Sequence, residues 1–513
     1  MQQFLERHAD RIIGVLRGFD RVLFRGSMLS ISYVGGLGKC LATLRIRYSR
    51  FADFVEGVSR EIKQHAKRVA EEQGRPMIHL NSPSVSKEDL ARQIAERDGI
   101  TQGLIAVFTC VESCQSFGLR RMGENHWLHL VPARRKCVFL YFYLMDREFG
   151  LMHVRLQTWL PMSIQVCLNG REYLARRMDR AGIRYEKRDN CFVRIDDLPR
   201  AQGMLDDLLR RDWVRFLDAL ARRFNPFARR KNRLNVRGYY WTFRQSEYAT
   251  DVMFRNDQAL AQVYPRLVRH AIDHFASAEV LRFLGRRTNR RFNGQVTSDI
   301  RTRPEGVRIK HRVEENSLKM YDKQGSVLRI ETTINNPERF KVRREVTRKG
   351  QLEVAWVPMR KSVADIARRV DICRAANERY LEALGVVGEP SPTRQLLDPV
   401  SHRITRDGRP YRALRPIEPE EARLFSTLLA SDFVLQGFRN QALRQRLFPQ
   451  CQTDPVARKK ASGRVTRLIR LLRAHKLVRK VPATFYYRIT SKGHHLMTTA
   501  LKLREIDLAQ LAT

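Results

Sequence analysis

The stretch NSLKMYDKQGSVLRIETTIN, residues 316–335, places a tyrosine, cations and a carboxylate at alternate positions. Its halves are rich in β-branched residues and are separated by a glycine, which is typical of a β-hairpin. Side chains alternate between the two faces of a strand, so only one register keeps the apolar residues together. That register sets Met320 opposite Ile330 and leaves the three-residue loop 324–326.

The polar face of this predicted hairpin gathers side chains suited to phosphoryl transfer, namely Tyr321, Lys323, Arg329 and Glu331. Tyr321 lies opposite Arg329 and is the predicted nucleophile. Arg329 and Lys323 are the expected catalytic cations, which favour the phenolate and hold a phosphate. Glu331 is expected to bind a divalent metal, Mg²⁺ or Mn²⁺, together with another carboxylate.

Asp299 is the second metal ligand that we expect, although the spacing alone does not select it from Asp322, Glu247 and Asp251. Asp322 falls on the apolar face of the hairpin unless a bulge turns it. The solvated face of any antiparallel hairpin carries similar residue types. Nucleic-acid contact without chemistry and a purely structural face therefore stay open as alternatives.

The segment NSLKMYDK…VLRIETTIN resembles the active-tyrosine region of rolling-circle replication initiators of filamentous phages and small plasmids. The resemblance is short and is carried mainly by the four polar residues named above. It implies a tyrosine on a strand of a palm-like sheet that nicks DNA and becomes 5′-phosphotyrosyl-linked, with a metal held by carboxylates. A metal-ligand histidine pair of the HUH kind is missing, since His270 and His274 have helical spacing.

The pattern of helices and strands expected along the chain predicts an α+β, multidomain fold. Runs rich in β-branched and aromatic residues predict a mixed or antiparallel, palm-like sheet with helical insertions. One helix is expected to begin at Ser86, which is followed by Asp89 in a capping pattern, and another to end at Gly182.

Four regions are expected along the chain. An N-terminal α+β domain covers 1–200, and a helical region with the hairpin that carries Tyr321 covers 201–384. The segment 385–418 is rich in Pro and Gly and poor in periodicity, which predicts a linker. Residues 419–513 form the last domain.

This last domain is expected to be a winged helix-turn-helix, because three helical stretches precede a strand, a Pro-containing tip and a second strand. Apolar residues of the third helix (458–475) fall on one stripe, at Val465, Leu468, Ile469 and Leu472. The predicted nucleic-acid-binding residues of the third helix and the wing are Lys460, Arg464, Arg467, Arg470, Arg479 and Lys480.

The charge balance indicates a polyanionic partner. Lys and Arg number 96 against 54 Asp and Glu, giving a net charge of +42. Nucleic acid is the commonest partner of such a chain, and the pattern favours DNA over RNA. A basic loop with aromatic residues supplies three further predicted nucleic-acid contacts, Arg229, Arg230 and Lys231.

No apolar run has the length of a membrane span, so we expect a cytoplasmic, nucleoid-associated protein with no membrane partner. No cofactor other than the divalent metal is expected, and the oligomeric state does not follow from the sequence. Two functions are consistent with these patterns. The first is a nucleic-acid-processing protein of a mobile element or plasmid, a metal-assisted tyrosine nickase or replication initiator. The alternative is a non-catalytic DNA- or RNA-binding regulator or architectural protein.

Overall fold

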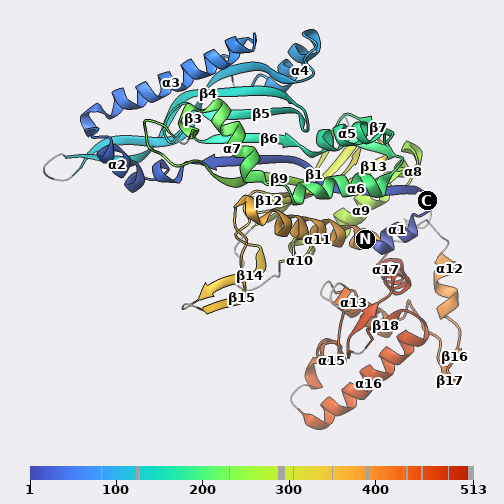
Figure 1. The fold of residues 1–513 in the computed structure, drawn as a ribbon. Coiled ribbons are helices and arrows are strands. Elements are labelled where there is room, and N and C mark those ends of the chain that lie inside the picture. Colours follow the sequence, from blue (N-terminus) through green and yellow to red (C-terminus); the bar gives the residue numbers. More distant parts are fainter. Residues whose placement is uncertain are drawn as a thin grey trace. The chain divides into compact units, whose positions relative to one another are not determined.

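The computed structural model describes residues 1–82, 84–122, 124, 127–229, 231–286, 295–303, 306–348, 351–387, 393–430, 433–434, 437–451, 454–482 and 484–505. The chain forms two compact units. Unit 1 comprises Met1–Ala9, Arg269–Glu279 and Arg379–Thr513, and unit 2 comprises Asp10–Val268 and Val280–Glu378. The fold is α+β, as expected, with a large mixed sheet and many helices (Figure 1).

Unit 2 is built on an eleven-stranded sheet with the order β10-β11-β12-β13-β9-β1-β6-β5-β4-β3-β2. These strands are β1 (Ile12–Ser27), β2 (Met77–His79), β3 (Gly103–Met122), β4 (Trp127–Asp146), β5 (Gly150–Gln157), β6 (Ile164–Asn169), β9 (Tyr240–Phe254), β10 (Val296–Arg303), β11 (Gly306–Val313), β12 (Asn316–Lys323) and β13 (Val327–Ile334). The β2–β3 pair is parallel, and the other neighbours in this sheet are antiparallel. Strands from the expected regions 1–200 and 201–384 thus share one sheet.

Two further ribbons in unit 2 are β7 (Tyr185–Arg188) with β8 (Cys191–Ile195), and β14 (Lys341–Arg348) with β15 (Gln351–Pro358). The helices that lie wholly in unit 2 are α2 (Val34–Thr43), α3 (Phe51–Glu72), α4 (Lys87–Arg97), α5 (Gly170–Ala181), α6 (Leu198–Asp206), α7 (Trp213–Phe224) and α8 (Asp257–Ala261). Both predicted helix ends are confirmed. The Ser86 hydroxyl accepts a hydrogen bond from the Asp89 N–H at the start of α4, and Gly182 ends α5 with φ 67°.

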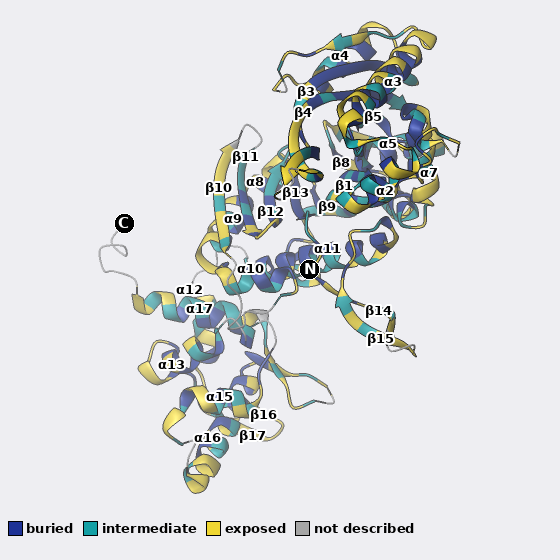
Figure 2. Cartoon of the chain, turned by 90° about the vertical axis from the view of Figure 1, so that its left-hand side faces the viewer, coloured by how far each residue is buried: buried dark blue, intermediate teal, exposed yellow. Residues whose placement is uncertain are grey.

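The two faces of the sheet pack against different helices. On one face, Phe142 of β4 stacks on Phe224 of α7, with ring centroids 4.3 Å apart. On the same face, Asn377 of α11 (Ile366–Leu384) accepts a 2.6 Å hydrogen bond from Thr332 of β13. On the opposite face, α4 packs in a buried cluster that contains Phe108 of β3. Figure 2 shows buried residues along the strands and exposed residues on the outer sides of α3 and α4.

Unit 1 contains α1 (Gln2–Arg7), α12 (Thr393–Leu397), β16 (Ile404–Arg406), β17 (Arg409–Tyr411), α13 (Pro419–Leu428), α15 (Asn440–Leu447), α16 (Pro455–Ala474), β18 (Val478–Lys480), β19 (Tyr487–Ile489) and α17 (Ser491–Glu505). Two helices, α9 (Tyr264–His274) and α10 (Ser277–Phe283), have residues in both units, as does α11. The expected linker 385–418 thus includes α12 and the β16–β17 ribbon.

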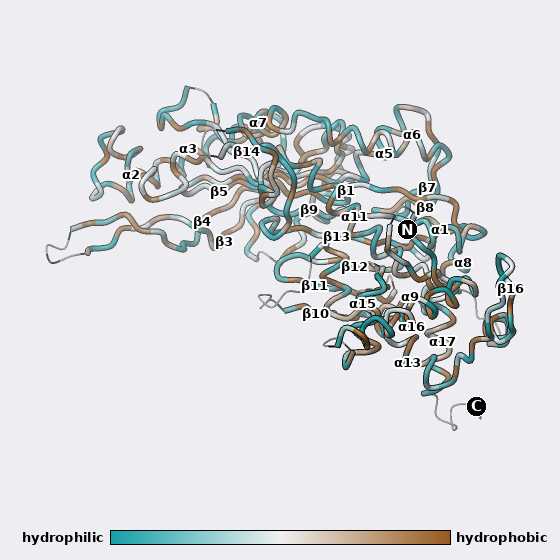
Figure 3. The backbone as a smooth tube through the Cα atoms, turned by 90° about the horizontal axis from the view of Figure 1, so that it is seen from below, coloured by the Kyte–Doolittle hydropathy of each residue, from teal (hydrophilic) through white to brown (hydrophobic). Residues whose placement is uncertain are grey.

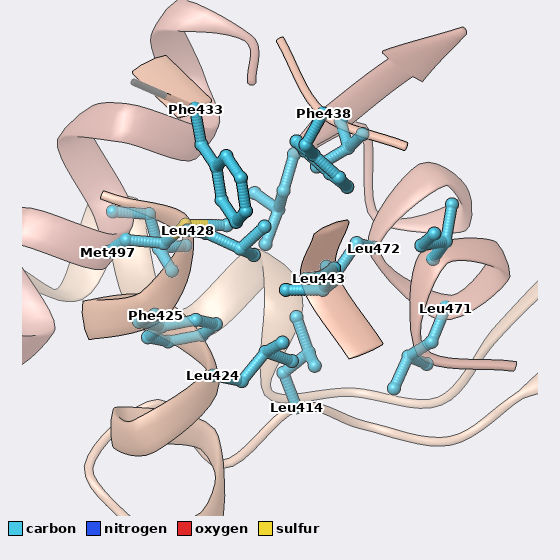
Figure 4. Packing of buried hydrophobic residues seen from close by; sticks show 14 of the residues in the cluster. Leu414, Leu424, Phe425, Leu428, Phe433, Phe438, Leu443, Leu471, Leu472 and Met497 are labelled. Atoms are coloured by element: carbon cyan, nitrogen blue, oxygen red, sulfur yellow. The ribbon is translucent and has the colours of Figure 1, made fainter. Parts of the chain in front are cut away.

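The apolar stripe predicted for the third C-terminal helix is confirmed in α16. Val465, Ile469 and Leu472 are buried in the hydrophobic core of unit 1, and Leu468 packs against that core. Leu424, Phe425 and Met497 contribute to the same core from α13 and α17 (Figure 4).

Hydrophobic residues are distributed over many short stretches of the chain, as the hydropathy colouring in Figure 3 shows. In the part of the chain that the structure describes, no helix combines the length and the apolar character needed to cross a bilayer.

Candidate metal and tyrosine site

The hairpin β12–β13 has the register predicted from its sequence. Met320 pairs with Ile330 and Tyr321 with Arg329, and the three residues 324–326 form the loop. Gln324 and Gly325 of the loop both have positive φ, 58° and 80°. The positive φ of Gly325 favours glycine at this position, because L side chains rarely adopt that conformation. The register prediction is therefore confirmed.

Three carboxylates from three neighbouring strands meet beside this hairpin: Asp20 of β1, Glu247 of β9 and Glu331 of β13. One carboxylate oxygen from each lies within 4.8 Å of the others. Their side chains are 11%, 12% and 2% exposed, respectively. We call these three residues the acidic triad.

A β-bulge gives Asp20 its place in the acidic triad. Phe19 pairs with Tyr248 and Arg21 with Glu247, so Asp20 is an extra residue on β1 without a partner on β9. Bulges redirect side chains in this way and are frequent beside functional sites. Asp20 was not among the sequence-based candidates. An alternating strand pattern over residues 19–26 (FDRVLFRG) assigns each side chain to one face and does not reveal a bulge. Glu247 was among the alternatives for the second carboxylate.

The Tyr321 hydroxyl donates a 2.9 Å hydrogen bond to Oε2 of Glu331, and Lys319 Nζ donates a 2.6 Å bond to Oε1 of the same carboxylate. Burial, and next the Glu331 charge, raise the pKa of Tyr321 well above its ordinary value. The Arg329 charge lowers the pKa of Tyr321, as expected of a neighbouring cation, but burial and Glu331 outweigh it. The phenol keeps its proton, and Glu331 is the acceptor placed to receive it. Burial by itself would raise the pKa of Glu331, but Lys319 and Arg329 bring it below its ordinary value.

Arg329 engages protein acceptors through all three guanidinium nitrogens. Its Nε and Nη2 donate to the two oxygens of Asp251 at 2.6 and 2.9 Å, and Nη1 lies 3.2 Å from Asp20 Oδ2. Arg171 Nη2 lies 2.8 Å from the same Asp251 carboxylate. Arg329 is 1% exposed. The structure therefore places this predicted phosphate-binding cation where it orients Asp20, and it offers no nitrogen to a phosphate.

Two further predicted site residues lie apart from the acidic triad. Lys323 Nζ donates a 3.0 Å hydrogen bond to Asp189, in the turn between β7 and β8. Asp299 of β10 pairs with Lys310 of β11. Lys310 in turn pairs with Lys319 of β12, and Lys319 pairs with Glu331 of β13. Three strand spacings, about 14 Å, thus separate the backbones of Asp299 and Glu331. Asp299 forms an ion pair with Arg301 and does not join the triad.

Each carboxylate of the acidic triad has one cationic neighbour, Arg329 for Asp20, Arg21 for Glu247 and Lys319 for Glu331, yet the carboxylates also repel one another. Burial, and next the nearby Glu331, raise the pKa of Glu247. Burial also raises the pKa of Asp20, where the attraction of Arg329 is opposed by Glu331. Oxygen-only donor sets of this kind suit Mg²⁺ or Mn²⁺, and a divalent cation would relieve the repulsion between the carboxylates. The residues present therefore fit a divalent metal.

The predicted nucleic-acid contacts of the C-terminal region lie on the surface of unit 1. Lys460, Arg464, Arg467 and Arg470 are exposed along α16, and Arg479 and Lys480 are exposed on β18. In the basic loop of unit 2, Arg229 and Lys231 are exposed, while Arg230 lies outside the described residues.

Comparisons of the chain with protein-family models, with curated proteins and with solved structures found no match.

Proposed function

We propose that this protein cleaves phosphodiester bonds of nucleic acid in a metal-dependent reaction at the acidic triad. The observation that carries the proposal is the meeting of three carboxylates, with one oxygen of each within 4.8 Å of the others, of which Glu331 accepts a hydrogen bond from the Tyr321 hydroxyl. Carboxylates that hold Mg²⁺ or Mn²⁺ are a recurrent means of stabilising the charge of a phosphoryl transition state. The net charge of +42 supports a polyanionic substrate.

In the proposed reaction Asp20, Glu247 and Glu331 would hold the metal, which would supply a Lewis acid for the scissile phosphate. The Tyr321 oxygen attacks phosphorus, and its proton passes to Oε2 of Glu331, 2.9 Å away. The bond between phosphorus and the 3′ oxygen breaks, and that oxygen takes a proton from water. The hydroxide left behind is neutralised by the proton that Glu331 received from Tyr321. The products are a 5′-phosphotyrosyl adduct and a free 3′ hydroxyl. The resemblance of residues 316–335 supports this tyrosine-nicking form and a role as an initiator in a mobile element or plasmid.

Purified protein incubated with single-stranded and supercoiled DNA and Mn²⁺ should test this proposal. Glu331→Gln and Asp20→Asn should abolish cleavage, since each removes a metal ligand while preserving shape. Tyr321→Phe should abolish the covalent adduct, which is detected as a protein–DNA band in a denaturing gel. Asp299→Asn is the matched control, because Asp299 lies outside the triad, and it should retain activity.

Two outcomes would separate the alternatives. If Tyr321→Phe still cleaved DNA while Glu331→Gln did not, water would be the nucleophile and Tyr321 would only orient Glu331. If wild-type protein bound DNA but did not cleave it with any divalent metal, the non-catalytic binding protein would be favoured.

We further propose that the segment from α15 to β19 is a winged helix-turn-helix that selects the DNA site. The order of helix, basic helix and β-ribbon supports this proposal, as does the excess of 17 Lys and Arg over 3 Asp and Glu from Gly437 onward. In such modules a helix enters the major groove and the ribbon contacts the backbone.

A further inference from the structure

Two groups of cations lie on the triad's face of the sheet, one on either side of the acidic triad. The β1 cation cluster is Arg25, Arg244 and Arg155. The β11 cation cluster is Arg308, Lys310 and Arg312. The pairing of the strands places these residues on that face, as the next two paragraphs describe, except for Arg244. Arg244 is an unpaired residue at a bulge of β9 and is included because its charge acts on Arg25.

The β1 cation cluster continues the line of β1 beyond the triad. Arg21 is opposite Glu247, and Arg25 lies four residues further along the same strand, on the same face and about 13 Å away. Arg25 pairs with Gln165 of β6, which pairs with Arg155 of β5. Burial, and next the charges of Arg244 and Arg155, lower the pKa of Arg25.

The β11 cation cluster lies on the other side of the triad. On β11, Arg308 is opposite Tyr321 and Lys310 is opposite Lys319. Strand β11 is separated from β13, which carries Glu331, by β12 alone. Two strand spacings correspond to about 10 Å. Burial, and next the charges of Arg312, Lys319 and Arg308, lower the pKa of Lys310.

Both clusters have unused hydrogen-bonding capacity. Within the described residues, Arg25 and Arg308 form no ion pair, and the Nε atom of each is buried without a hydrogen-bond acceptor. Such donors are rare in folded proteins and indicate an acceptor that the chain itself does not supply. In the β1 cation cluster Arg155 already pairs with Glu112, 2.6 Å away. Arg25 and Arg308, in contrast, are half-buried beside other cations, which is costly unless an anion joins them.

We propose that the two clusters bind phosphates of one single strand of nucleic acid, which crosses this face obliquely from the β11 cation cluster, over the acidic triad, to the β1 cation cluster. A single strand is favoured over a duplex because the triad carboxylates are at most 12% exposed. A flexible single strand can bring a phosphodiester to these buried carboxylates, whereas the fixed width of a duplex keeps its phosphates away from them. The assignment depends on the proposed function only in treating the triad as the reacting centre.

The test is the salt dependence of binding, measured by fluorescence anisotropy on the full chain with a labelled single-stranded oligonucleotide in EDTA. Each lost phosphate contact lowers the slope of log K against log salt by about 0.7 for a single strand. The double variant Arg25→Gln, Arg308→Gln should therefore reduce the slope by about 1.4. The matched control is Arg60→Gln, Arg215→Gln, which removes two exposed cations from α3 and α7. It should leave the slope unchanged.

Because EDTA prevents metal-dependent cleavage, this result is independent of the proposed activity. An unchanged slope in the folded double variant, with cleavage by the wild type intact, would overturn the strand path and leave the proposed function in place. Photo-cross-linking of wild-type protein to a thiothymidine oligonucleotide gives a second test that needs no variant. Cross-links should fall within 12–27, 240–254 and 306–323, and cross-links confined to 437–505 would also overturn the proposal.

Discussion

At the scale of single residues, the site is organised around the proton of Tyr321. Cations surround the hairpin, yet the phenol is held in its neutral form by burial and by the Glu331 carboxylate. The positive charges act on carboxylates instead, with Lys319 on Glu331 and Arg329 on Asp251 and Asp20. A nucleophile with its base at 2.9 Å is the arrangement used where the unperturbed pKa of the nucleophile is too high for direct ionisation.

The raised pKa values of Asp20 and Glu247 predict that metal binding depends on pH. A carboxyl whose pKa is raised in the folded protein binds its proton more tightly there than in the unfolded chain. The metal-free protein therefore loses stability as pH rises from the ordinary carboxyl range through these elevated values. Mn²⁺ competes with the same protons, so its stabilising effect should grow over that window.

Thermal unfolding with Mn²⁺ and with EDTA, from about pH 5 to about pH 8, measures this effect. The rise in Tm caused by Mn²⁺ should be larger at the upper end, and Asp20→Asn should diminish it. Asp299→Asn should behave as the wild type. A Tm shift that is equal at every pH, or one that survives Asp20→Asn, would contradict a triad-bound metal.

At the scale of elements, the hairpin register was predictable because it depends on residues within one short segment. The alternation of apolar and polar residues in 316–335 allows only one pairing, and β12–β13 adopts it. The apolar stripe of α16 was predictable for the same reason. The neighbours of the hairpin were not predictable, since β9 and β1 come from distant parts of the chain. Asp20 also depends on a bulge that alternation cannot reveal, and Asp299 was chosen without knowing the strand order.

The turn between β18 and β19 carries an element-scale prediction. Phe485 is 80% exposed in this turn, and Tyr486 beside it packs under Arg439, with the guanidinium 4.3 Å from the ring centroid. An exposed aromatic among cations is suited to stacking on a base, which is worth about 1–3 kcal/mol. Phe485→Ala should therefore weaken DNA binding by roughly 5- to 150-fold.

Anisotropy with a DNA ligand would measure this loss, and Val456→Ala provides the control. Val456 is 63% exposed near the start of α16, so its truncation removes similar exposed apolar area from the same unit. Equal affinities for the two variants would show that Phe485 does not contact the nucleic acid.

At the scale of the whole molecule, unit 1 is assembled from three separate segments of the chain. The N-terminal residues belong to it: Phe4 of α1 is fully buried, the Met1 ammonium pairs with Glu382, and Arg7 donates a 2.7 Å hydrogen bond to the Val386 carbonyl. The sequence-based division placed residues 1–9 in the N-terminal domain. The sequence gives no sign that its first helix contacts residues more than 370 positions away, such as Val386.

This assembly predicts that Phe4→Ala destabilises unit 1 and not unit 2, which begins at Asp10. Truncating a fully buried phenylalanine costs about 3–5 kcal/mol. Differential scanning calorimetry should resolve two transitions, and the one raised by Mn²⁺ belongs to unit 2, which holds the acidic triad. Phe4→Ala should lower the other transition. The matched control, Phe51→Ala in α3, removes a buried ring from unit 2 and should lower the Mn²⁺-sensitive transition instead. If Phe4→Ala lowered only the Mn²⁺-sensitive transition, α1 would fold with the sheet, and the three-segment composition of unit 1 would be wrong.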